Sequence, residues 1–286
     1  MNSSQSKTEA YKNYEFKKLC HIIGFNESEI NPLLDSIESN YKEWSETKLD
    51  KAGNAKTYLD GTIKTRTFRN PSQLLKVVQK RIQRNIIDIV SLPDNVHGGV
   101  KGKSNITNAK AHQGNKYLFE TDLQEFYPNI KMRRVHKIFK NLGYSEHIAH
   151  WLTKLTTRKN EVPQGSPTST GISNLVFLET DYKLIEICKK NNIKYTRYID
   201  DLTFSSQQDF GHLISEILEI VIGGDFKISR RKTKYSGGQT ITGVHVFLNK
   251  IDAPKKIIDK AHLEKESNTV MKPYTNYLNS IRKTNK

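Results

Sequence analysis

The pattern of apolar and polar positions predicts an amphipathic helix between Asn70 and Pro93. Apolar side chains recur at the spacing of one helix face: Leu75, Val78, Ile82, Ile86 and Ile89. Asn70 and Pro71 are suited to the N-cap and the first helical position, and Pro93 ends the run. A second stripe, with the four-residue spacing of neighbours on a helix surface, is basic: Lys76, Lys80 and Arg84. We therefore expect one face to pack and the other to meet phosphate groups.

Short strand patterns alternate with helix patterns in the rest of the chain. Strands are predicted at residues 117–122, 193–200, 202–205 and 240–247. Helices are predicted at residues 16–23, 33–44, 135–142, 174–190 and 213–221. Turns are marked by Gly143, Gly223-Gly224 and Gly237-Gly238. This order predicts an α+β fold in which an antiparallel sheet packs on helices.

Composition indicates a folded protein. The 286 residues are 35% hydrophobic and 27% charged, with a net charge of +16, which is not the balance of a disordered chain. No apolar run approaches the roughly 18 residues that span a bilayer, and the first residues lack a hydrophobic signal core. We expect a soluble, cytoplasmic protein without a membrane partner. Cys20 and Cys188 are too few for a disulfide framework and are expected to be buried, reduced thiols.

The positive charge is concentrated in residues 61–116. This stretch holds 11 basic and 2 acidic residues, a net charge of +9. A local excess of this kind attracts a polyanion, for which nucleic acid is the first candidate and a generically basic surface is the alternative. The segment from His97 to Ser104 combines glycines with Lys101 and Lys103, which would let the backbone approach a phosphate chain closely.

Three aspartates lie at the ends of apolar strands. Asp122 ends one predicted strand, and Asp200-Asp201 stands between two others. Adjacent carboxylates in a half-buried place require a shared proton or a cation. Oxygen ligands that leave room for phosphate are how Mg²⁺ is held at phosphoryl-transfer sites, where two ions can activate a hydroxyl and stabilise a leaving pyrophosphate. A hairpin turn with two solvated aspartates is the alternative interpretation.

Together with their neighbours, these motifs resemble those of the reverse transcriptase family. Pro163-Gln164-Gly165 lies in a turn-rich segment directly before a predicted helix, which suits contact with a template or an incoming nucleotide. In chain order, the segments similar to family motifs are Asp122 with Phe126-Tyr127-Pro128, then Pro163-Gln164-Gly165, then Tyr198-Ile199-Asp200-Asp201 (the YxDD box), then Lys232-Thr233. The resemblance extends from about residue 64 to about residue 247.

Within that family the chain is most similar to bacterial retron reverse transcriptases. Residues 108–112, from Asn108 to His112, match the NAxxH signature, and Ile241-Thr242-Gly243 resembles the VTG signature. Two positions depart from the retron pattern. Ile241 stands in place of valine and Ile199 in place of the usual alanine of the YxDD box, and both changes replace one apolar residue by another. His112 taken alone also fits a core histidine.

The resemblance implies a role for each site residue. Asp122, Asp200 and Asp201 would hold two Mg²⁺ ions (Mn²⁺ is also possible), with the Leu123 carbonyl as a fourth contact. RNA contacts are expected from the basic helix stripe, the glycine-rich loop and the NAxxH signature: Lys76, Lys80, Arg84, Lys101, Lys103, Asn108 and His112.

Leu123 and four further residues would bind the nucleotide. Tyr127 matches the family's gate against a ribose 2′-hydroxyl, with a core tyrosine as the alternative. Gln164 would lie against the incoming nucleotide. Lys64 and Arg66 would neutralise its triphosphate, unless they are ordinary surface charges. Lys232 would donate a proton to the leaving pyrophosphate, although its basic neighbours also fit a solvated, phosphate-facing strip.

The implied architecture is a right-hand polymerase. Its parts would be an N-terminal helical region (1–60), fingers (61–116 with part of 130–170), a palm (117–248) and a short thumb (249–286). The resemblance implies an RNA-directed DNA polymerase that uses dNTPs to copy its own structured non-coding RNA into RNA-linked DNA (msDNA), in an antiphage retron system with an effector protein. The alternatives are another prokaryotic reverse transcriptase, of a group II intron or a different defence system, and a non-catalytic RNA-binding scaffold.

Overall fold

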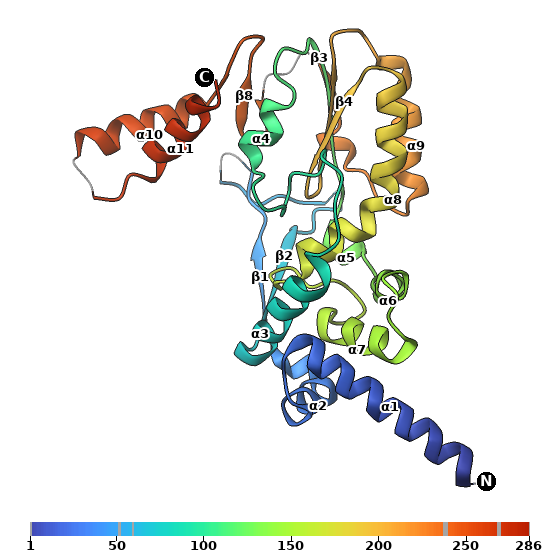
Figure 1. Ribbon diagram of the computed structural model, residues 1–286. Coiled ribbons are helices and arrows are strands. Elements are labelled where there is room, and N and C mark those ends of the chain that lie inside the picture. Colours follow the sequence, from blue (N-terminus) through green and yellow to red (C-terminus); the bar gives the residue numbers. More distant parts are fainter. Residues whose placement is uncertain (1, 51–52, 59, 237–239, 268–269, 286) are drawn as a thin grey trace. The chain divides into compact units, whose positions relative to one another are not determined.

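The computed structural model describes residues 2–50, 53–58, 60–236, 240–267 and 270–285 (Figure 1). The chain divides into two compact units, each made from two stretches of sequence. The first unit comprises residues 1–91 and 127–176, and the second comprises residues 92–126 and 177–286. The predicted turn at Gly237-Gly238 lies outside the described residues.

The first unit is mainly helical. Its helices and helical turns are α1 (Asn2–Ile23), α2 (Glu27–Asp35), η1 (Ile37–Asn40), α3 (Gln73–Ile82), the π-helical η2 (Gln83–Ile87), α6 (Met132–Asn141) and α7 (Glu146–Thr156). It also holds an antiparallel pair of strands, β1 (Tyr41–Thr47) and β2 (Thr65–Pro71). Two helices continue from one unit into the other, α5 (Phe126–Asn129) and α8 (Ser169–Lys190).

The basic helix begins later than its sequence predicts. Asn70 and Pro71 end strand β2, where Pro71 pairs with Tyr41, so the prediction of a cap at Asn70 is wrong. The N-cap is Ser72, whose hydroxyl accepts a hydrogen bond from the Leu75 amide.

The helix also ends differently from the prediction. The π-helical turn adds one residue to the helical repeat and rotates the apolar face. Ile86 and Ile87 are buried there, whereas Ile89 is 71% exposed and does not continue the buried stripe.

The helix predicted at residues 33–44 is wrong in its second half. Helix α2 ends at Asp35, and Tyr41 begins strand β1. Trp44 stacks on Phe68 of the neighbouring strand, with ring centroids 5.4 Å apart. This aromatic pair and the register of β1 with β2 stabilise the strand, and tertiary contacts of this kind override local helix propensity. The helix predicted at residues 16–23 is confirmed within α1, where Phe16 packs on Trp151 of α7 with ring centroids 4.9 Å apart.

The second unit contains a four-stranded antiparallel sheet. The strand order is β4 (Lys194–Tyr198), β5 (Asp201–Ser206), β3 (Tyr117–Asp122) and β6 (Lys234–Ser236). The helical elements are α4 (Asn105–Lys110), the later part of α8, η3 (Gly211–Leu213), α9 (Ile214–Gly223), η4 (Arg230–Lys232), α10 (Lys255–Glu266) and α11 (Pro273–Lys283). Mixed helices and antiparallel sheets are therefore confirmed. The assignment of fingers, palm and thumb stays a prediction.

The two faces of this sheet carry different side chains. Phe119 of β3 contacts Phe204 of β5, with ring centroids 5.6 Å apart, on the face covered by α8. The alternate residues Leu118, Glu120 and Asp122 point to the other face. In Figure 1, α4 lies on one side of the sheet and α8 with α9 on the other. The face that carries Asp122 is therefore the one free of the large helices.

The strand predicted at residues 240–247 is instead a hairpin. Strands β7 (Thr240–Ile241) and β8 (Val244–Val246) pair antiparallel, and β9 (Ile251–Asp252) pairs with β8. Thr242 and Gly243 have φ of 44° and 81°, and this left-handed pair reverses the chain. The prediction of one continuous strand is wrong because Thr242 adopts a conformation that threonine rarely takes.

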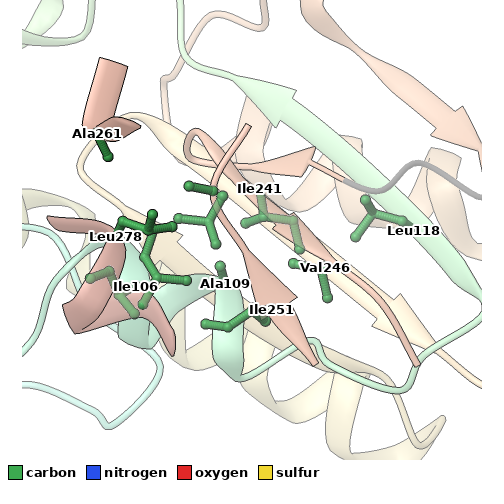
Figure 2. Close-up of a cluster of buried hydrophobic side chains, with 11 residues drawn as sticks. Ile106, Ala109, Leu118, Ile241, Val246, Ile251, Ala261 and Leu278 are labelled. Atoms are coloured by element: carbon green, nitrogen blue, oxygen red, sulfur yellow. The ribbon is translucent and has the colours of Figure 1, made fainter. Parts of the chain in front are cut away.

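A hydrophobic cluster joins α4 to the β7–β8 hairpin and to the C-terminal helices (Figure 2). Its buried side chains come from α4, β3, β7 to β9, α10 and α11: Ile106, Ala109, Leu118, Ile241, Val244, Val246, Ile251, Ala253, Ala261, Leu278 and Ile281. The NAxxH and ITG segments, far apart in sequence, therefore share one core.

The strand predicted at residues 193–200 is too long, because β4 ends at Tyr198, and Ile199 and Asp200 form the turn before β5. The other predictions about local structure agree with the structure. The helices expected at residues 135–142, 174–190 and 213–221 correspond to α6, α8 and α9, although α8 begins earlier, at Ser169, and Leu213 lies in η3. Cys20 and Cys188 are buried and unbridged, as predicted. Burial raises the pKa of the Cys20 thiol to about 11 and that of Cys188 to about 12.

Candidate active site

The three predicted aspartates come together in the second unit. Asp122, the last residue of β3, pairs across the sheet with Asp201, the first residue of β5. Asp200 lies in the two-residue turn between β4 and β5, because Tyr198 pairs with Asp201. The Leu123 amide donates a hydrogen bond to the Asp200 carbonyl at 2.9 Å. The hairpin alternative is thus correct about the turn, but the turn is packed against a second strand that carries Asp122.

Burial and the neighbouring carboxylates govern the charge of Asp201. Asp122 is 6% exposed. Burial, followed by the charges of Asp200 and Asp122, raises the pKa of Asp201 to about 7. The site therefore carries negative charge that is only partly neutralised by protons near neutral pH.

Lys232 contacts this carboxylate group. Its ammonium forms an ion pair with Asp122 Oδ1. Burial would lower the pKa of Lys232, but the hydrogen bond and charge of Asp122 outweigh it, so the pKa is raised. Lys232, which lies in η4, is accordingly a charged partner of the aspartates, and its side chain is 59% exposed.

A cavity of about 220 Å³ opens beside these groups. Its lining combines carboxylates with basic and hydroxyl groups: Glu120, Thr121, Asp122, Asp201, Leu202, Thr203, Arg231, Lys232, Lys234 and Thr242. Glu120 was not predicted as a site residue, although it lies two residues before Asp122 on a strand, which places both on one face. Burial raises its pKa despite the charge of Lys234.

The donor groups fit a hard divalent cation. Carboxylate oxygens are the ligands that Mg²⁺ and Mn²⁺ prefer, and a cation would relieve the repulsion that raises the pKa of Asp201. Across the described residues, no group of three or more His, Cys, Asp or Glu side chains has the arrangement of a metal site. The fit therefore rests on the chemistry of the donors. Leu123 is buried beside Asp200, and its carbonyl contact with a metal stays a prediction.

The predicted RNA contacts of Asn108 and His112 are contradicted by burial. Both side chains are enclosed, at 0% and 1% exposure. The His112 ring nitrogens lie 2.6 Å from Ser205 Oγ and 2.7 Å from Thr196 Oγ1. Burial lowers the pKa of His112 to about 3, so the ring is neutral. The alternative of a core histidine is the correct one.

Asn105, at the start of α4, makes contacts that the sequence did not reveal. Its side-chain amide donates to the Thr242 carbonyl at 3.1 Å and to the Tyr277 hydroxyl at 2.6 Å. Helix α4 is thus tied to the ITG turn and to α11. The NAxxH and VTG-like segments are parts of one structural support, in which the buried Asn108 amide also donates to the Thr242 hydroxyl at 3.4 Å.

The predicted loop lysines differ in their surroundings. Lys101 is exposed, whereas Lys103 Nζ donates to the Asp94 carbonyl at 2.5 Å. Only Lys101 therefore presents its charge fully to solvent.

Apart from Leu123, which lies in the second unit, the predicted nucleotide-binding residues belong to the first unit. The Tyr127 hydroxyl lies 3.1 Å from Thr170 Oγ1, and the Gln164 carbonyl accepts a hydrogen bond from the Arg69 amide at 2.8 Å. Lys64 Nζ lies 4.7 Å from the centre of the Tyr58 ring, and Arg66 is exposed on β2. On the basic helix, Lys80 and Arg84 are exposed and Lys76 is half-buried. The predicted roles of these residues remain predictions.

Comparison with known proteins identifies the family. Residues 50–246 match the family model "Reverse transcriptase (RNA-dependent DNA polymerase)". The chain belongs to the reverse transcriptase family. Members of this family generally use divalent metal ions, in agreement with the chemistry of the three aspartates.

Several curated relatives are retron reverse transcriptases. The chain is 30% identical over 220 residues to the retron Se72 reverse transcriptase of Salmonella heidelberg (76% of this chain, 55% of the relative). It is 32% identical over 197 residues to the retron Ec86 enzyme of Escherichia coli (65% and 60%) and 28% identical over 249 residues to the Ec73 enzyme (76% and 79%). The chain thus spans little more than half the length of the first two. The resemblance to retron reverse transcriptases is confirmed.

The predicted absence of a membrane partner has a limited test. Of the helices in the described parts of the chain, none combines the length and the apolar character needed to cross a membrane.

Proposed function

We propose that this protein is an RNA-directed DNA polymerase of the retron type, which copies a structured non-coding RNA into RNA-linked DNA. The observation that carries the proposal is the pairing of Asp122 with Asp201, beside Asp200, in a cavity that also contains Lys232. The family match and the retron relatives support the reaction class.

The aspartates would bind the catalytic ions. Asp122, Asp200 and Asp201 are the proposed ligands, with the Leu123 carbonyl as a further contact. Two bound Mg²⁺ ions would supply activation of the primer hydroxyl and stabilisation of the pyrophosphate charge, and Mn²⁺ could substitute. The raised pKa of Asp201 means that cation binding must compete with a proton near neutral pH. Polymerisation should therefore need less metal as the pH rises through about 7.

Lys232 is the proposed acid for the leaving group. Its ion pair with Asp122 keeps the ammonium protonated and beside the carboxylates in the resting protein. In the reaction the Lys232 ammonium would donate its proton to an oxygen of the leaving pyrophosphate.

Residues of the first unit would select and hold the nucleotide. Tyr127 is proposed as the steric gate against ribonucleotides, Gln164 as a contact of the incoming dNTP, and Lys64 and Arg66 as partners of its triphosphate. For Tyr127, the bond to Thr170 fixes the hydroxyl and supports a rigid ring. Replacement of Tyr127 by alanine should raise ribonucleotide incorporation about tenfold or more.

The remaining roles follow from charge and from the relatives. RNA contacts are proposed for the basic residues of the helix and the loop, of which Lys80, Arg84 and Lys101 are exposed and Lys76 and Lys103 are partly buried. Asn108 and His112 are buried and are not proposed as RNA contacts. Fingers, palm and thumb at the predicted boundaries, a cytoplasmic location and an antiphage effector partner are also part of the proposal. Residues 1–60 are proposed as a helical support of the fingers or a face for that partner.

Primer extension tests the proposal. The purified protein should extend a DNA primer on an RNA template with Mg²⁺, and the Asp200→Ala, Asp201→Ala double variant should lose at least about a thousandfold in rate because both ligands are removed. Glu179→Ala, on an exposed helix surface, is the matched control and should keep the parental rate. Synthesis that persists in the double variant would instead favour the RNA-binding scaffold.

The retron assignment needs a cellular test. Expression of the gene with its flanking DNA should yield small DNA that is joined to RNA, and the double aspartate variant should yield none. Primer extension in vitro without such a product in cells would favour a reverse transcriptase of a group II intron or another defence system.

A further inference from the structure

A buried ion pair lies on the face of the second unit's sheet that is turned away from the carboxylates. Arg197 of β4 and Asp181 of α8 have fully buried side chains, with 0% exposure each. Arg197 Nη2 lies 2.6 Å from Asp181 Oδ2, and Arg197 Nε donates to Asp181 Oδ1 at 3.0 Å. The pair is therefore bidentate and enclosed.

Other groups complete this network. The Tyr195 hydroxyl donates to Asp181 Oδ1 at 2.7 Å, and the Arg197 guanidinium lies 4.7 Å from the centre of the Phe177 ring. Burial of two charges costs several kcal/mol, and apolar replacements of similar size often stabilise a fold equally well. Stability alone is accordingly a weak reason for this pair.

One donor of Arg197 is directed elsewhere. Arg197 Nη1 donates to the carbonyl of Ile199 at 3.1 Å. Ile199 is the first residue of the two-residue turn that carries Asp200, and its φ is 61°. Glycine is the usual residue there, because a β-branched side chain is strained in the left-handed region.

Backbone contacts also hold the turn in place. The Arg197 carbonyl accepts a hydrogen bond from the His97 amide at 2.8 Å. Gly98 approaches so closely that a Cβ there would stand 2.3 Å from the Ile199 nitrogen. The strained turn is thus held by the charged side chain of Arg197 and by the close approach of Gly98.

We propose that Arg197 is a positioning residue for polymerisation: anchored by Asp181, it holds Ile199 in the left-handed conformation and so orients the turn that carries Asp200 and places Asp201 at the cavity. The inference rests on the proposed function. Arg197 touches none of the reacting atoms and acts through the turn. A guanidinium suits this role because it can bind a carboxylate with two donors and still direct a third at a carbonyl.

The first test removes the charges without leaving one unpaired. In the triple variant Asp181→Leu, Tyr195→Phe, Arg197→Met, every polar side-chain group of the network is replaced by an apolar group of similar size. We expect thermal unfolding close to that of the parent. Primer extension should fall about tenfold or more in kcat with little change in the KM for dNTP, because the turn loses its orientation and nucleotide binding is made elsewhere.

A second readout does not depend on activity. Hydrogen exchange of a peptide that spans residues 198–203 should speed up at least about tenfold in the folded triple variant, because the turn opens more often. Tyr195→Phe alone is the matched control, since it removes a bond to Asp181 but leaves the Arg197 bond to Ile199. It should change neither readout.

Rescue distinguishes positioning from simple packing. Adding Ile199→Gly to the triple variant removes the cost of the left-handed conformation, so most of the lost kcat should return. Full rate and slow exchange in a folded triple variant would overturn the proposal, and so would a lost rate that Ile199→Gly leaves unrestored.

A variant that does not fold is covered by Arg197→Lys. Lysine can keep the ion pair with Asp181 but lacks the fork that also reaches Ile199, so kcat should fall and exchange should rise. Unchanged values in this variant would contradict the proposal. If the parent itself extends no primer, the proposed function fails, and the exchange measurement still decides whether Arg197 holds the turn.

Discussion

The two units support their signature loops with different chemistry. In the second unit the turn that carries Asp200 is held by a fully buried ion pair. In the first unit the Pro163-Gln164-Gly165 loop is held by a neutral amide: Ser166 Oγ donates to Gln79 Oε1 at 2.7 Å, and Gln79 Nε2 donates to the Tyr41 hydroxyl at 2.8 Å.

The difference shows which support is more sensitive. A buried amide that loses a partner leaves one unsatisfied polar group, whereas a buried charge that loses its partner leaves an uncompensated ion. The ion pair that holds the turn with the carboxylates is therefore more sensitive to single substitutions than the neutral amide of the first unit.

The largest expected effect comes from breaking each support once. Arg197→Met leaves Asp181 buried and unpaired, and should lower the free energy of unfolding by about 3–5 kcal/mol. Gln79→Leu should cost about 1–3 kcal/mol, because the Ser166 and Tyr41 hydroxyls lose a neutral partner. Urea unfolding of both variants measures the two costs. Equal costs would contradict the comparison.

The next effect is a pH dependence of the second unit. His112 has its pKa lowered from 6.5 to about 3 by burial, so the unfolded chain binds more protons between these values and stability falls as pH falls. Between about pH 7 and pH 5, the protonation of His112 in the unfolded chain should lower the free energy of unfolding by about 2 kcal/mol.

The check is urea unfolding of the parent and of His112→Gln at both pH values. The variant should be less stable at neutral pH and should lose less stability on acidification. An equally steep decline in the variant would assign the pH dependence to other groups, such as His97, whose pKa burial lowers to about 4.

A third prediction concerns the approach of Gly98 to the turn. Gly98→Ala must displace the Ile199 backbone, which should lower kcat about tenfold while the KM for dNTP changes little. Gly223→Ala is the matched control, because a Cβ there would meet no atom within 4 Å. A parental rate in Gly98→Ala would show that the turn tolerates displacement.

The smallest effect is expected from the partly exposed charges of the first unit. Glu43 pairs with Arg69 at 2.8 Å and with Arg158 at 2.8 Å, and the hydrogen bond from Arg69 lowers its pKa below the usual 4.5. This contribution is present above about pH 4.5 and is lost as the pH falls through the lowered pKa. Glu43→Gln should cost up to about 1 kcal/mol near neutral pH and less in acid. A cost that stays constant with pH would contradict the assignment.

Local signals in the sequence were enough to predict the carboxylate face. Asp122 ends an apolar strand, and Asp200-Asp201 interrupts two others, so the positions of these residues on strands and turns were confirmed. The pairing of β3 with β5 could not be read from the sequence, because four helices and β4 lie between these two strands in the chain.

Features that depend on tertiary contacts were missed. Nothing near Arg197 in the sequence indicates Asp181 as its partner, and the alternation of β4 alone does not reveal which face a helix covers. Trp44 was placed in a helix because its strand partner Phe68 lies beyond a long hairpin. Thr242 was placed in a strand because its β-branched side chain favours one, although the structure holds it at φ 44°.

Strand β3 pairs with β5 and β6. The second stretch of the first unit, residues 127–176, lies between β3 and these two strands in the chain. The closure of so long a loop makes the contact order of the second unit high and its folding slow compared with that of a local hairpin. During synthesis, Asp122 emerges from the ribosome long before Asp201 is available to pair with it. The pair of Asp122 and Asp201 therefore cannot form until residues 201–206 have been synthesised.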